Sequence, residues 1–247
     1  MRLLLSGEGP TDIGVTRPTV GGPQFVPGPM AWFVDRLLEP RLGYSALELH
    51  ESGADCIRHI HEAELAAGGR RGSPLLPGVR FGKGTAFFTR NAQVLGLIAL
   101  EDAQFTGRPV IAVLFRDGDG TRSMPKMQWQ QKFDSIARGF ELVDFTTGVP
   151  MVPRPKSEAW LICALKTPPS QDCDQLEDSP GNDGSPHALK SRLATLHGSE
   201  PGADVQAEWV RTGLVDPAAI DMPSCVAFRA ALDHAAHAIG LGAAPGF

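Results

Sequence analysis

Two groups of acidic residues stand where the chain is predicted to leave a buried strand. Residues 8–12 read Glu-Gly-Pro-Thr-Asp and follow the apolar residues 2–6, and residues 117–119 read Asp-Gly-Asp and follow the apolar residues 109–115. Carboxylates that are crowded together repel one another unless a cation neutralises them. A set of oxygen ligands suits Mg²⁺ or Mn²⁺. The predicted metal ligands in these two motifs are Glu8, Asp12, Asp117 and Asp119.

Each of the two motifs also has a purely structural explanation. A glycine-rich acidic turn after a strand is often only a solvated loop, and Thr11 or Asp12 could cap a helix. The glycines of the second motif would equally ease a turn that lets Asp117 and Asp119 reach one ion. Because both motifs follow strands of one predicted sheet, their joint occurrence favours the metal site.

A third motif, Pro-Lys-Ser-Glu-Ala-Trp over residues 155–160, combines a lysine with a carboxylate. Ser157 is predicted to cap a helix there, and Glu158 would lie in its first turn, where a carboxylate is favoured even without a function. The functional interpretation makes Glu158 a further metal ligand and Lys156 a contact of a phosphate group. The other predicted phosphate or nucleic-acid contacts are Lys83, Arg122 and Lys126, although surface solvation is the simpler explanation of the last two.

Apolar segments that alternate with helical patterns predict an α/β fold with a mostly parallel sheet, in which the carboxyl ends of the strands gather functional groups. The predicted strands are residues 2–6, 44–49, 109–115 and 142–146. The predicted helices of this part are residues 31–38, which Pro40 would stop, and residues 85–101, 125–138 and 157–165. Residues 17–29 and 68–84, which are rich in glycine, are predicted loops.

The last third of the chain has a different composition. Residues 167–186 are polar and rich in proline, aspartate and serine, and they predict a flexible connection. Helices are predicted at residues 187–196, 203–212 and 224–239. We therefore expect an α/β core over residues 1–166, the connection over residues 167–186, and a small helical C-terminal extension over residues 187–247.

Composition and charge limit the function further. The 247 residues are 42% hydrophobic and carry a net charge of −5, which argues against a protein that coats nucleic acid nonspecifically. Residues 167–247 hold 4 basic against 11 acidic residues, whereas residues 70–138 hold 11 basic against 5 acidic. A locally basic surface beside acidic metal ligands suits a substrate that carries phosphate.

The cysteines and the apolar segments predict the compartment. Cys56, Cys163, Cys173 and Cys225 are scattered without a Cys-x-x-Cys pair, so reduced and mostly buried thiols are expected. No apolar run approaches the ~20 residues that span a bilayer, and the apolar start is too short for a signal peptide. These features predict a cytoplasmic protein without membrane contact.

Together the motifs resemble the TOPRIM fold, whose signature is a glutamate after the first strand and an Asp-x-Asp pair after a later one. Residues 8–12 are similar to the extended motif Glu-Gly-x-Thr/Ser-Asp of overcoming-lysogenisation-defect (OLD) nucleases. The chain is also similar to small TOPRIM-like bacterial proteins that are often encoded beside ABC-type ATPases in defence loci. That closer resemblance lies in residues 8–12, 157–161, 182–184, Lys190 and 222–224.

The resemblance implies metal-dependent hydrolysis of phosphodiesters in DNA or RNA, with an ABC-type ATPase as a partner and self-association as a further expectation. Two ions about 4 Å apart would activate water and stabilise the leaving oxygen. Glu8 and Asp12 would hold one ion, with Glu8 as the alternative general acid or base, and Asp117 and Asp119 would hold the other with support from Glu158. Positive charge at the scissile phosphate would come from Lys156, Arg122 and Lys126.

Other activities are weighed against the same residues. A topoisomerase needs a tyrosine nucleophile and large strand-gating domains, and Tyr44 is the only tyrosine. Residues 117–121 resemble the Asp-x-Asp-Gly-Thr motif of haloacid-dehalogenase-like phosphatases, with Asp117 as nucleophile and Asp119 as acid or base. That alternative leaves residues 8–12 unexplained. A non-catalytic TOPRIM-like adaptor of an ATPase is the third alternative, since the sequence has no phosphate-binding loop for ATP of its own.

Overall fold

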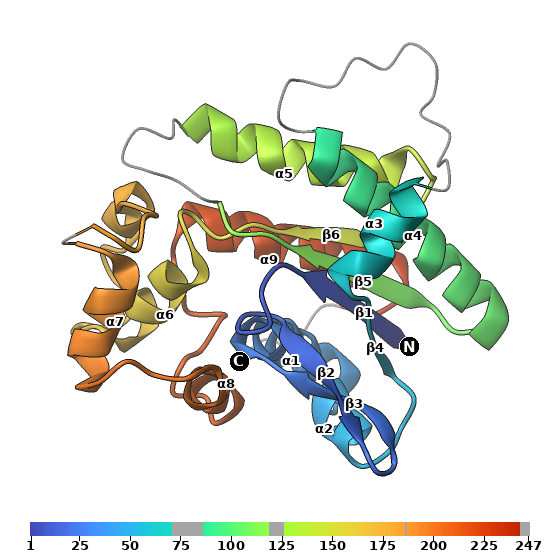
Figure 1. The fold of residues 1–247 in the computed structure, drawn as a ribbon, viewed down its shortest axis with the longest axis horizontal. Coiled ribbons are helices and arrows are strands. Elements are labelled where there is room, and N and C mark those ends of the chain that lie inside the picture. The colour runs from blue at the N-terminus through green and yellow to red at the C-terminus, as the bar shows by residue number, and fades with distance from the viewer. Residues whose placement is uncertain (71–85, 119–125, 186, 243–247) are drawn as a thin grey trace.

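A four-stranded sheet of parallel strands forms the centre of the molecule (Figure 1). The computed structural model describes residues 1–70, 86–118, 126–185 and 187–242. The strand order is β4 (Ile57–His59), β1 (Arg2–Gly7), β5 (Val110–Phe115) and β6 (Gly148–Met151). Each neighbouring pair is parallel. The predicted α/β class with a mostly parallel sheet flanked by helices is therefore confirmed.

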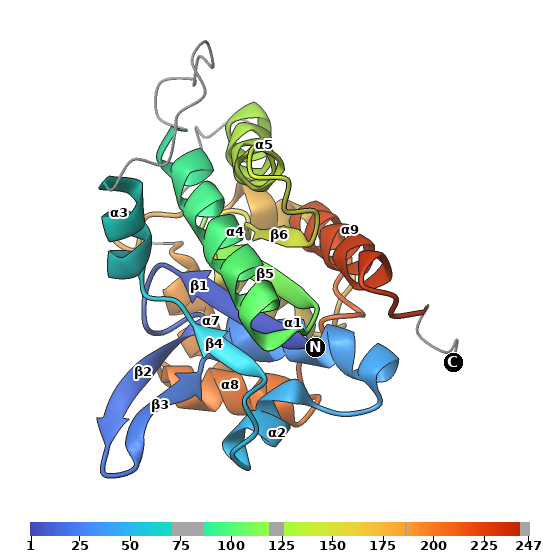
Figure 2. The same ribbon diagram turned by 90° about the vertical axis from the view of Figure 1, so that its right-hand side faces the viewer.

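Helices lie on both sides of this sheet. In Figure 2, α3 (Glu62–Arg70), α4 (Ala86–Thr106) and α5 (Lys126–Glu141) lie on one side. On the other side lie α1 (Pro29–Leu42), α2 (Ala46–Glu51) and α8 (Ala203–Arg211). Strand β1 contributes to both cores, because Leu3 and Leu5 point into one and Leu4 into the other. This burial on both faces explains why β1 and β5 are continuous apolar runs.

The other helices follow β6 in the sequence. They are α6 (Ser157–Leu165), the short 3₁₀ helix η1 (Asp174–Asp178), α7 (Leu189–His197), α8 and α9 (Pro223–Ala238). These bounds confirm the predicted helix at residues 157–165 and the three predicted helices of the last third. No helix within the described ranges is long and apolar enough to cross a membrane.

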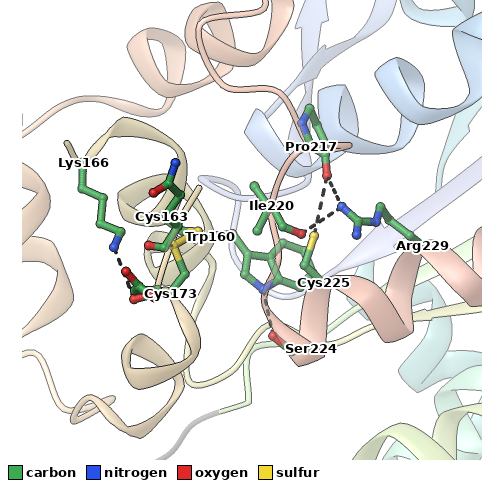
Figure 3. Close-up of a disulfide and its surroundings, with 11 residues drawn as sticks. Trp160, Cys163, Lys166, Cys173, Pro217, Ile220, Ser224, Cys225 and Arg229 are labelled. Atoms are coloured by element: carbon green, nitrogen blue, oxygen red, sulfur yellow. Dashed lines mark hydrogen bonds between the residues drawn. A yellow bond between two sulfur atoms is a disulfide. The ribbon is translucent and has the colours of Figure 1, made fainter. Parts of the chain in front are cut away.

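The core joins the last third of the chain to the sheet. Trp160 of α6 is fully buried, and its ring stacks on Phe33 of α1 and on Phe228 of α9, with ring centroids 5.7 and 5.8 Å apart. Its indole N–H donates to the hydroxyl of Ser224 at 2.9 Å (Figure 3). Within residues 167–186, the side chain of Glu177 is buried and accepts the backbone N–H of Ser224 at 2.6 Å. Trp160 thus anchors α6 in the core between α1 and α9.

The predicted loop at residues 17–29 is wrong. The chain forms an antiparallel hairpin of β2 (Gly14–Thr19) and β3 (Gly22–Pro27), separate from the main sheet. Pro18 and Pro23 lie opposite each other in its register. A two-stranded ribbon has free edges, so it accepts prolines that a central strand would exclude. Proline and glycine therefore suggested a loop where the chain builds an exposed ribbon.

Two predicted strands and one predicted helix end are also wrong. Residues 44–49 include the start of helix α2, because Ser45 accepts the backbone N–H of Glu48 and the buried Asp35 accepts those of Ala46 and Leu47. The last strand lies at Gly148–Met151 and not at residues 142–146. Pro40 does not stop α1, which continues to Leu42. Pro40 cannot donate to the carbonyl of Arg36, but the helix ends two residues later, so only this one intrahelical bond is lost.

The prediction of four reduced cysteines is wrong for one pair. Cys163 of α6 and Cys173 form a disulfide (Figure 3), whereas Cys56 and Cys225 are free and buried as predicted. The backbone N–H of Ser170 donates to the carbonyl of Cys163 at 2.8 Å, and this turn brings the chain back to α6. Such proximity depends on the fold of the turn, and the spacing of the cysteines gives no sign of it.

Reduction of this disulfide is expected to destabilise the protein. The bond closes a loop with a sequence separation of 10 residues, and the loss of loop entropy in the unfolded chain corresponds to about 2–3 kcal/mol. Denaturant unfolding with and without dithiothreitol measures the effect. The Cys163→Ser/Cys173→Ser variant should match the reduced protein and show no response to the reductant. A wild-type protein that is insensitive to reduction would contradict the expectation.

The hairpin meets the sheet at His59, and this contact predicts a loss of stability in acid. Thr16 Oγ1 and His59 Nδ1 lie 3.0 Å apart, and the His59 ring stacks on Phe25. Burial first, and His61 second, lower the pKa of His59 to about 4. The folded state therefore binds fewer protons than the unfolded state below the ordinary histidine pKa of about 6.5. The stability that neutral His59 contributes is present above that pH and is lost toward about pH 4.

Urea unfolding at several pH values tests this expectation. The free energy of unfolding of wild type should fall relative to that of His59→Gln between about pH 6.5 and 4, with a slope below about 1.4 kcal/mol per pH unit, the limit for one proton. His187→Gln, at an exposed histidine, is the control and should leave the pH dependence unchanged. A constant difference between wild type and His59→Gln would refute the expectation.

Candidate functional site

The carboxyl ends of β1 and β5 bring the first two acidic motifs together. Gly7 lies opposite Phe115 in the parallel register, so the residues that follow the two strands are neighbours. The Glu8 carboxylate accepts the backbone N–H of Asp117 at 2.7 Å, although 109 residues separate the two. The structure thus places Glu8 and Asp117 at one edge of the sheet, as the pattern of two buried strands predicts.

Asp12 is held at the same edge by the start of α1. Its carbonyl accepts the backbone N–H of Met30 at 3.0 Å, and the carbonyl of Ile13 accepts that of Gly28 at 3.1 Å. A Cβ atom at Gly28 would lie only 2.3 Å from the Asp12 carbonyl oxygen. Glycine at position 28 therefore allows the close approach that fixes the backbone of Asp12.

Ser157 connects two of the acidic residues. Its hydroxyl donates to the Asp12 carboxylate, and its backbone N–H donates to the Asp117 carboxylate at 3.1 Å. The prediction that Ser157 caps the helix is wrong, because α6 begins at Ser157 and Lys156 stands at the cap position without a side-chain bond. Ser157 thus belongs to the site, although the sequence pattern predicts only a helix cap at this residue. Its place in residues 157–161, one of the segments of the closer resemblance, is the signal that could have revealed it.

Glu158 contributes a third carboxylate, and its surroundings leave one oxygen unsatisfied. The residue is only 8% exposed, and its Oε2 atom has no hydrogen-bond partner. Burial raises the pKa of Glu158, and the negative charge of Asp12 raises it further. A buried carboxylate oxygen without a donor is costly unless a cation or a proton satisfies it.

The same conflict affects the two aspartates. Burial raises the pKa of Asp12, opposed by the hydrogen bond from Ser157. Burial also raises the pKa of Asp117 well above its usual range, and the charges of Asp12 and Glu158 add to the effect. Three carboxylates that face one another with too few donors form a region of strong negative potential.

Oxygen donors of this kind fit a hard divalent cation. The unpartnered Glu158 oxygen supplies a vacant ligand, and Asp12, Asp117 and Glu158 line one pocket. Among the residues that the structure describes, no three His, Cys, Asp or Glu side chains already surround one point closely enough to hold an ion. The donor types therefore fit the metal, and small movements of these side chains would have to complete the coordination.

The pocket at this edge has a volume of about 370 Å³ and two different walls. One wall comes from the edge of the sheet and the start of α6, and it consists of Thr11, Asp12, Asp117, Lys156 and Glu158. The other comes from α7 and the start of α8, and it consists of Lys190, residues 200–203 and Gln206. Asp12, Asp117, Lys156 and Glu158 of the first wall are predicted site residues, whereas no residue of the second wall is.

Two lysines give the pocket positive charge. Lys156 and Lys190 lie 3.0 and 3.3 Å from the two carboxylate oxygens of Asp183, which therefore holds both amines at the pocket. Asp183 and Lys190 belong to the segments that resemble the small TOPRIM-like bacterial proteins, and nothing else in the sequence indicates that they lie at this site. A third amine, that of Lys132, donates to the carbonyls of Asp117 and Gly118 at 2.8 and 3.1 Å and fixes the backbone after β5.

Several predicted site residues cannot be placed. Asp119, Arg122 and Lys83 lie outside the described residues, and Lys126 begins α5 without a described side chain. Of the predicted residues, the structure brings together Glu8, Asp12, Asp117, Lys156 and Glu158.

Fold and site define an α/β protein with an acidic pocket at the carboxyl edge of a parallel sheet. No protein-family model, curated protein or solved structure matches the chain. The resemblance to TOPRIM proteins therefore depends on the sequence motifs, and the chemistry of the pocket has to be argued from its own residues.

Proposed function

We propose that this protein is a metal-dependent nuclease that hydrolyses phosphodiesters with Mg²⁺ or Mn²⁺. The observation that carries the proposal is the buried, unpartnered oxygen of Glu158, a residue that lines one pocket together with Asp12 and Asp117. Two lysines line the same pocket. Acidic ligands for a cation beside amines for an anion are the combination that phosphoryl chemistry requires.

The proposed roles follow from the contacts. Asp12, Asp117 and Glu158 would hold the cation, with Asp119 as the further ligand that the second motif predicts. Ser157 orients Asp12 and Asp117 through its hydroxyl and its N–H. A bound divalent ion would lower the pKa of a water ligand and offset negative charge at the phosphate.

Glu8 and Lys156 have separate proposed roles. The Glu8 carboxylate is already used to hold the backbone N–H of Asp117, so its main role would be to position Asp117, with ligand or general acid–base duty as the alternative. The Lys156 side chain is 16% exposed and lines the pocket, and its amine would neutralise charge on the scissile phosphate.

Cleavage assays with matched variants test the proposal. Single-stranded and double-stranded DNA and RNA are incubated with Mg²⁺, with Mn²⁺ and with EDTA. The test variant is Glu158→Gln, which replaces a carboxylate with an amide. Asp134→Asn makes the same replacement at an exposed position of α5 and serves as the control. Metal-dependent cleavage that Glu158→Gln abolishes and Asp134→Asn retains would support the nuclease, whereas cleavage that is equal in all three proteins would exclude this pocket.

The phosphatase alternative assigns no role to residues 8–12. In the structure, Glu8 accepts a hydrogen bond from the backbone of Asp117, and Ser157 donates to the carboxylates of both Asp12 and Asp117. This convergence favours the nuclease. Hydrolysis of a phosphomonoester with Asp117 trapped as a phosphoryl adduct would instead support the phosphatase.

The partners and the compartment are proposals of the same kind. We propose an ABC-type ATPase partner in a bacterial defence or DNA-processing system, a homo-oligomer as a further assembly, and a cytoplasmic location. Disulfides are rare in reducing compartments, so the redox state of Cys163 and Cys173 in cells tests the location. Tight association with an ATPase in the absence of any metal binding would support the adaptor alternative.

A further inference from the structure

The second wall of the pocket has features of an anion site. Helix α8 points its amino end into the pocket, since Gly202 at the cap position, Ala203 and Gln206 all line it. Gly202 at the cap position has no side chain to cap this helix, and Asp204 lies in its first turn. The first backbone N–H groups of a helix have no partner within the helix, and the helix dipole makes them attractive to an anion. Lys190, whose side chain is about half exposed, adds an amine.

Glu158 lines the same pocket as this end of α8 and has an unpartnered oxygen, which is a separate sign that the pocket takes a ligand. Glu158 is 8% exposed and lines the same pocket as Gly202 and Lys190. The wall with Glu158 thus has a carboxylate oxygen that a cation could satisfy. The wall with α8 and Lys190 offers amide and amine donors to an anion. A cation bridged to a phosphate group would satisfy both walls at once.

The balance of charge in the pocket decides the order in which the cation and the phosphate group bind. Four carboxylates line the pocket, those of Asp12, Asp117, Glu158 and Glu200, against the two amines of Lys156 and Lys190. Asp183 further offsets both amines. A phosphate that entered this pocket alone would meet net negative charge, so it requires a cation at the carboxylates first.

We propose that the amino end of α8, with Lys190, forms a subsite that binds a substrate phosphate group only after a divalent cation has entered the pocket. The proposal rests on the proposed function for the nature of the substrate, and it adds a second phosphate contact apart from the scissile one. The same chemistry would accept an internal phosphate of a nucleic-acid strand or the phosphate at its end. The subsite therefore sets how the strand lies across the carboxylates.

Calorimetric titration with inorganic phosphate tests the subsite without any need for cleavage. Phosphate should bind in Mg²⁺ and at least about tenfold more weakly in EDTA. Lys190→Gln should weaken the Mg²⁺-dependent binding about tenfold, as the loss of one charge-assisted contact predicts. Lys166→Gln, which changes a lysine outside the pocket, is the matched control and should bind as wild type.

A second variant removes a backbone donor and leaves the side chains in place. Ala203→Pro puts proline at the first helical position, where its fixed φ is compatible with the helix, and the extended backbone of Gly202 suits a following proline. Thermal unfolding confirms that the variant folds. It should weaken phosphate binding about threefold or more, because one amide N–H is lost.

The outcomes separate this inference from the nuclease proposal. Phosphate binding that is equal with and without Mg²⁺, or unchanged in both Lys190→Gln and Ala203→Pro, would overturn the subsite even if the protein cleaves nucleic acid. Intact Mg²⁺-dependent phosphate binding without cleavage of any nucleic acid would support the subsite and weigh against the nuclease. If the terminal phosphate is the ligand, a 5′-phosphorylated oligonucleotide binds about tenfold more tightly than the unphosphorylated one, and equal affinities exclude the 5′-terminal phosphate as the ligand.

Discussion

Replacing Asp117 with asparagine is expected to reduce metal-dependent cleavage at least 100-fold and, at the same time, to raise the stability of the metal-free protein. The loss of activity follows because loss of even an outer partner of a metal ligand costs about 10–100-fold, and Asp117 is proposed as a direct ligand. The gain in stability follows because burial and the neighbouring carboxylates raise the pKa of Asp117. Asparagine keeps an oxygen that accepts the N–H of Ser157.

The dependence on pH gives this prediction its sign. A carboxyl whose pKa is raised in the folded state binds more protons there than in the unfolded state. Wild type therefore loses stability as the pH rises above the usual aspartate range. Asp117→Asn has no carboxyl group at this position, so its stability should not show this loss. The melting temperature of the variant should exceed that of wild type at neutral pH, and the difference should shrink as the pH falls toward about 4.

Adding Mg²⁺ reverses the comparison. A cation that binds only the folded state stabilises it, so wild type should gain thermal stability from Mg²⁺ and Asp117→Asn should gain little. Asp134→Asn provides the control with the same chemical change at an exposed residue. A variant that is less stable than wild type in EDTA, or that retains full activity, would contradict the proposed role of Asp117.

Replacing Trp160 with alanine is expected to lower the free energy of unfolding by about 3–5 kcal/mol, the range for large buried aromatic side chains. Trp160 is fully buried between Phe33 and Phe228. The change opens a cavity between three helices and removes the donor to Ser224. Chemical denaturation at neutral pH measures the loss. The control, Phe105→Ala, removes a side chain that is 92% exposed and should change stability by less than about 0.5 kcal/mol.

Trp160→Phe separates packing from hydrogen bonding. Phenylalanine keeps an aromatic ring between Phe33 and Phe228 but cannot donate to Ser224, so it should retain most of the stability. A Trp160→Ala protein as stable as wild type would show that α6 is not held by this stack.

The elements with a strong local signal could be predicted from the sequence. Strands β1 and β5 are apolar runs buried on both faces, and Glu8 and Asp117 follow them, so their proximity follows from a parallel sheet. The hairpin of β2 and β3 could not be recognised, because proline and glycine usually mark loops. At the start of helix α2, the backbone N–H groups of Ala46 and Leu47 donate to the carboxylate of Asp35 in α1. The local pattern of residues 44–49 does not show this contact.

The second wall of the candidate site was beyond prediction for a similar reason. Lys190 and Gly202 come from the last third of the chain, and only the packing of α7 and α8 brings them to the carboxylates. The pairing of Lys156 with Asp183 spans 27 residues and has no periodicity to reveal it. The disulfide of Cys163 and Cys173 likewise depends on a turn whose shape the composition does not encode.

The order in which the pocket residues occur along the chain has a consequence during synthesis. The carboxylates of Asp12, Asp117 and Glu158 leave the ribosome well before Lys190 and Gly202, and Phe228, which packs on Trp160, emerges last. A nascent chain of about 170 residues would therefore carry the acidic half of the pocket without the opposing half and with α6 only partly packed. Both walls of the pocket are therefore present only after the last third of the chain has been synthesised and has packed on α6.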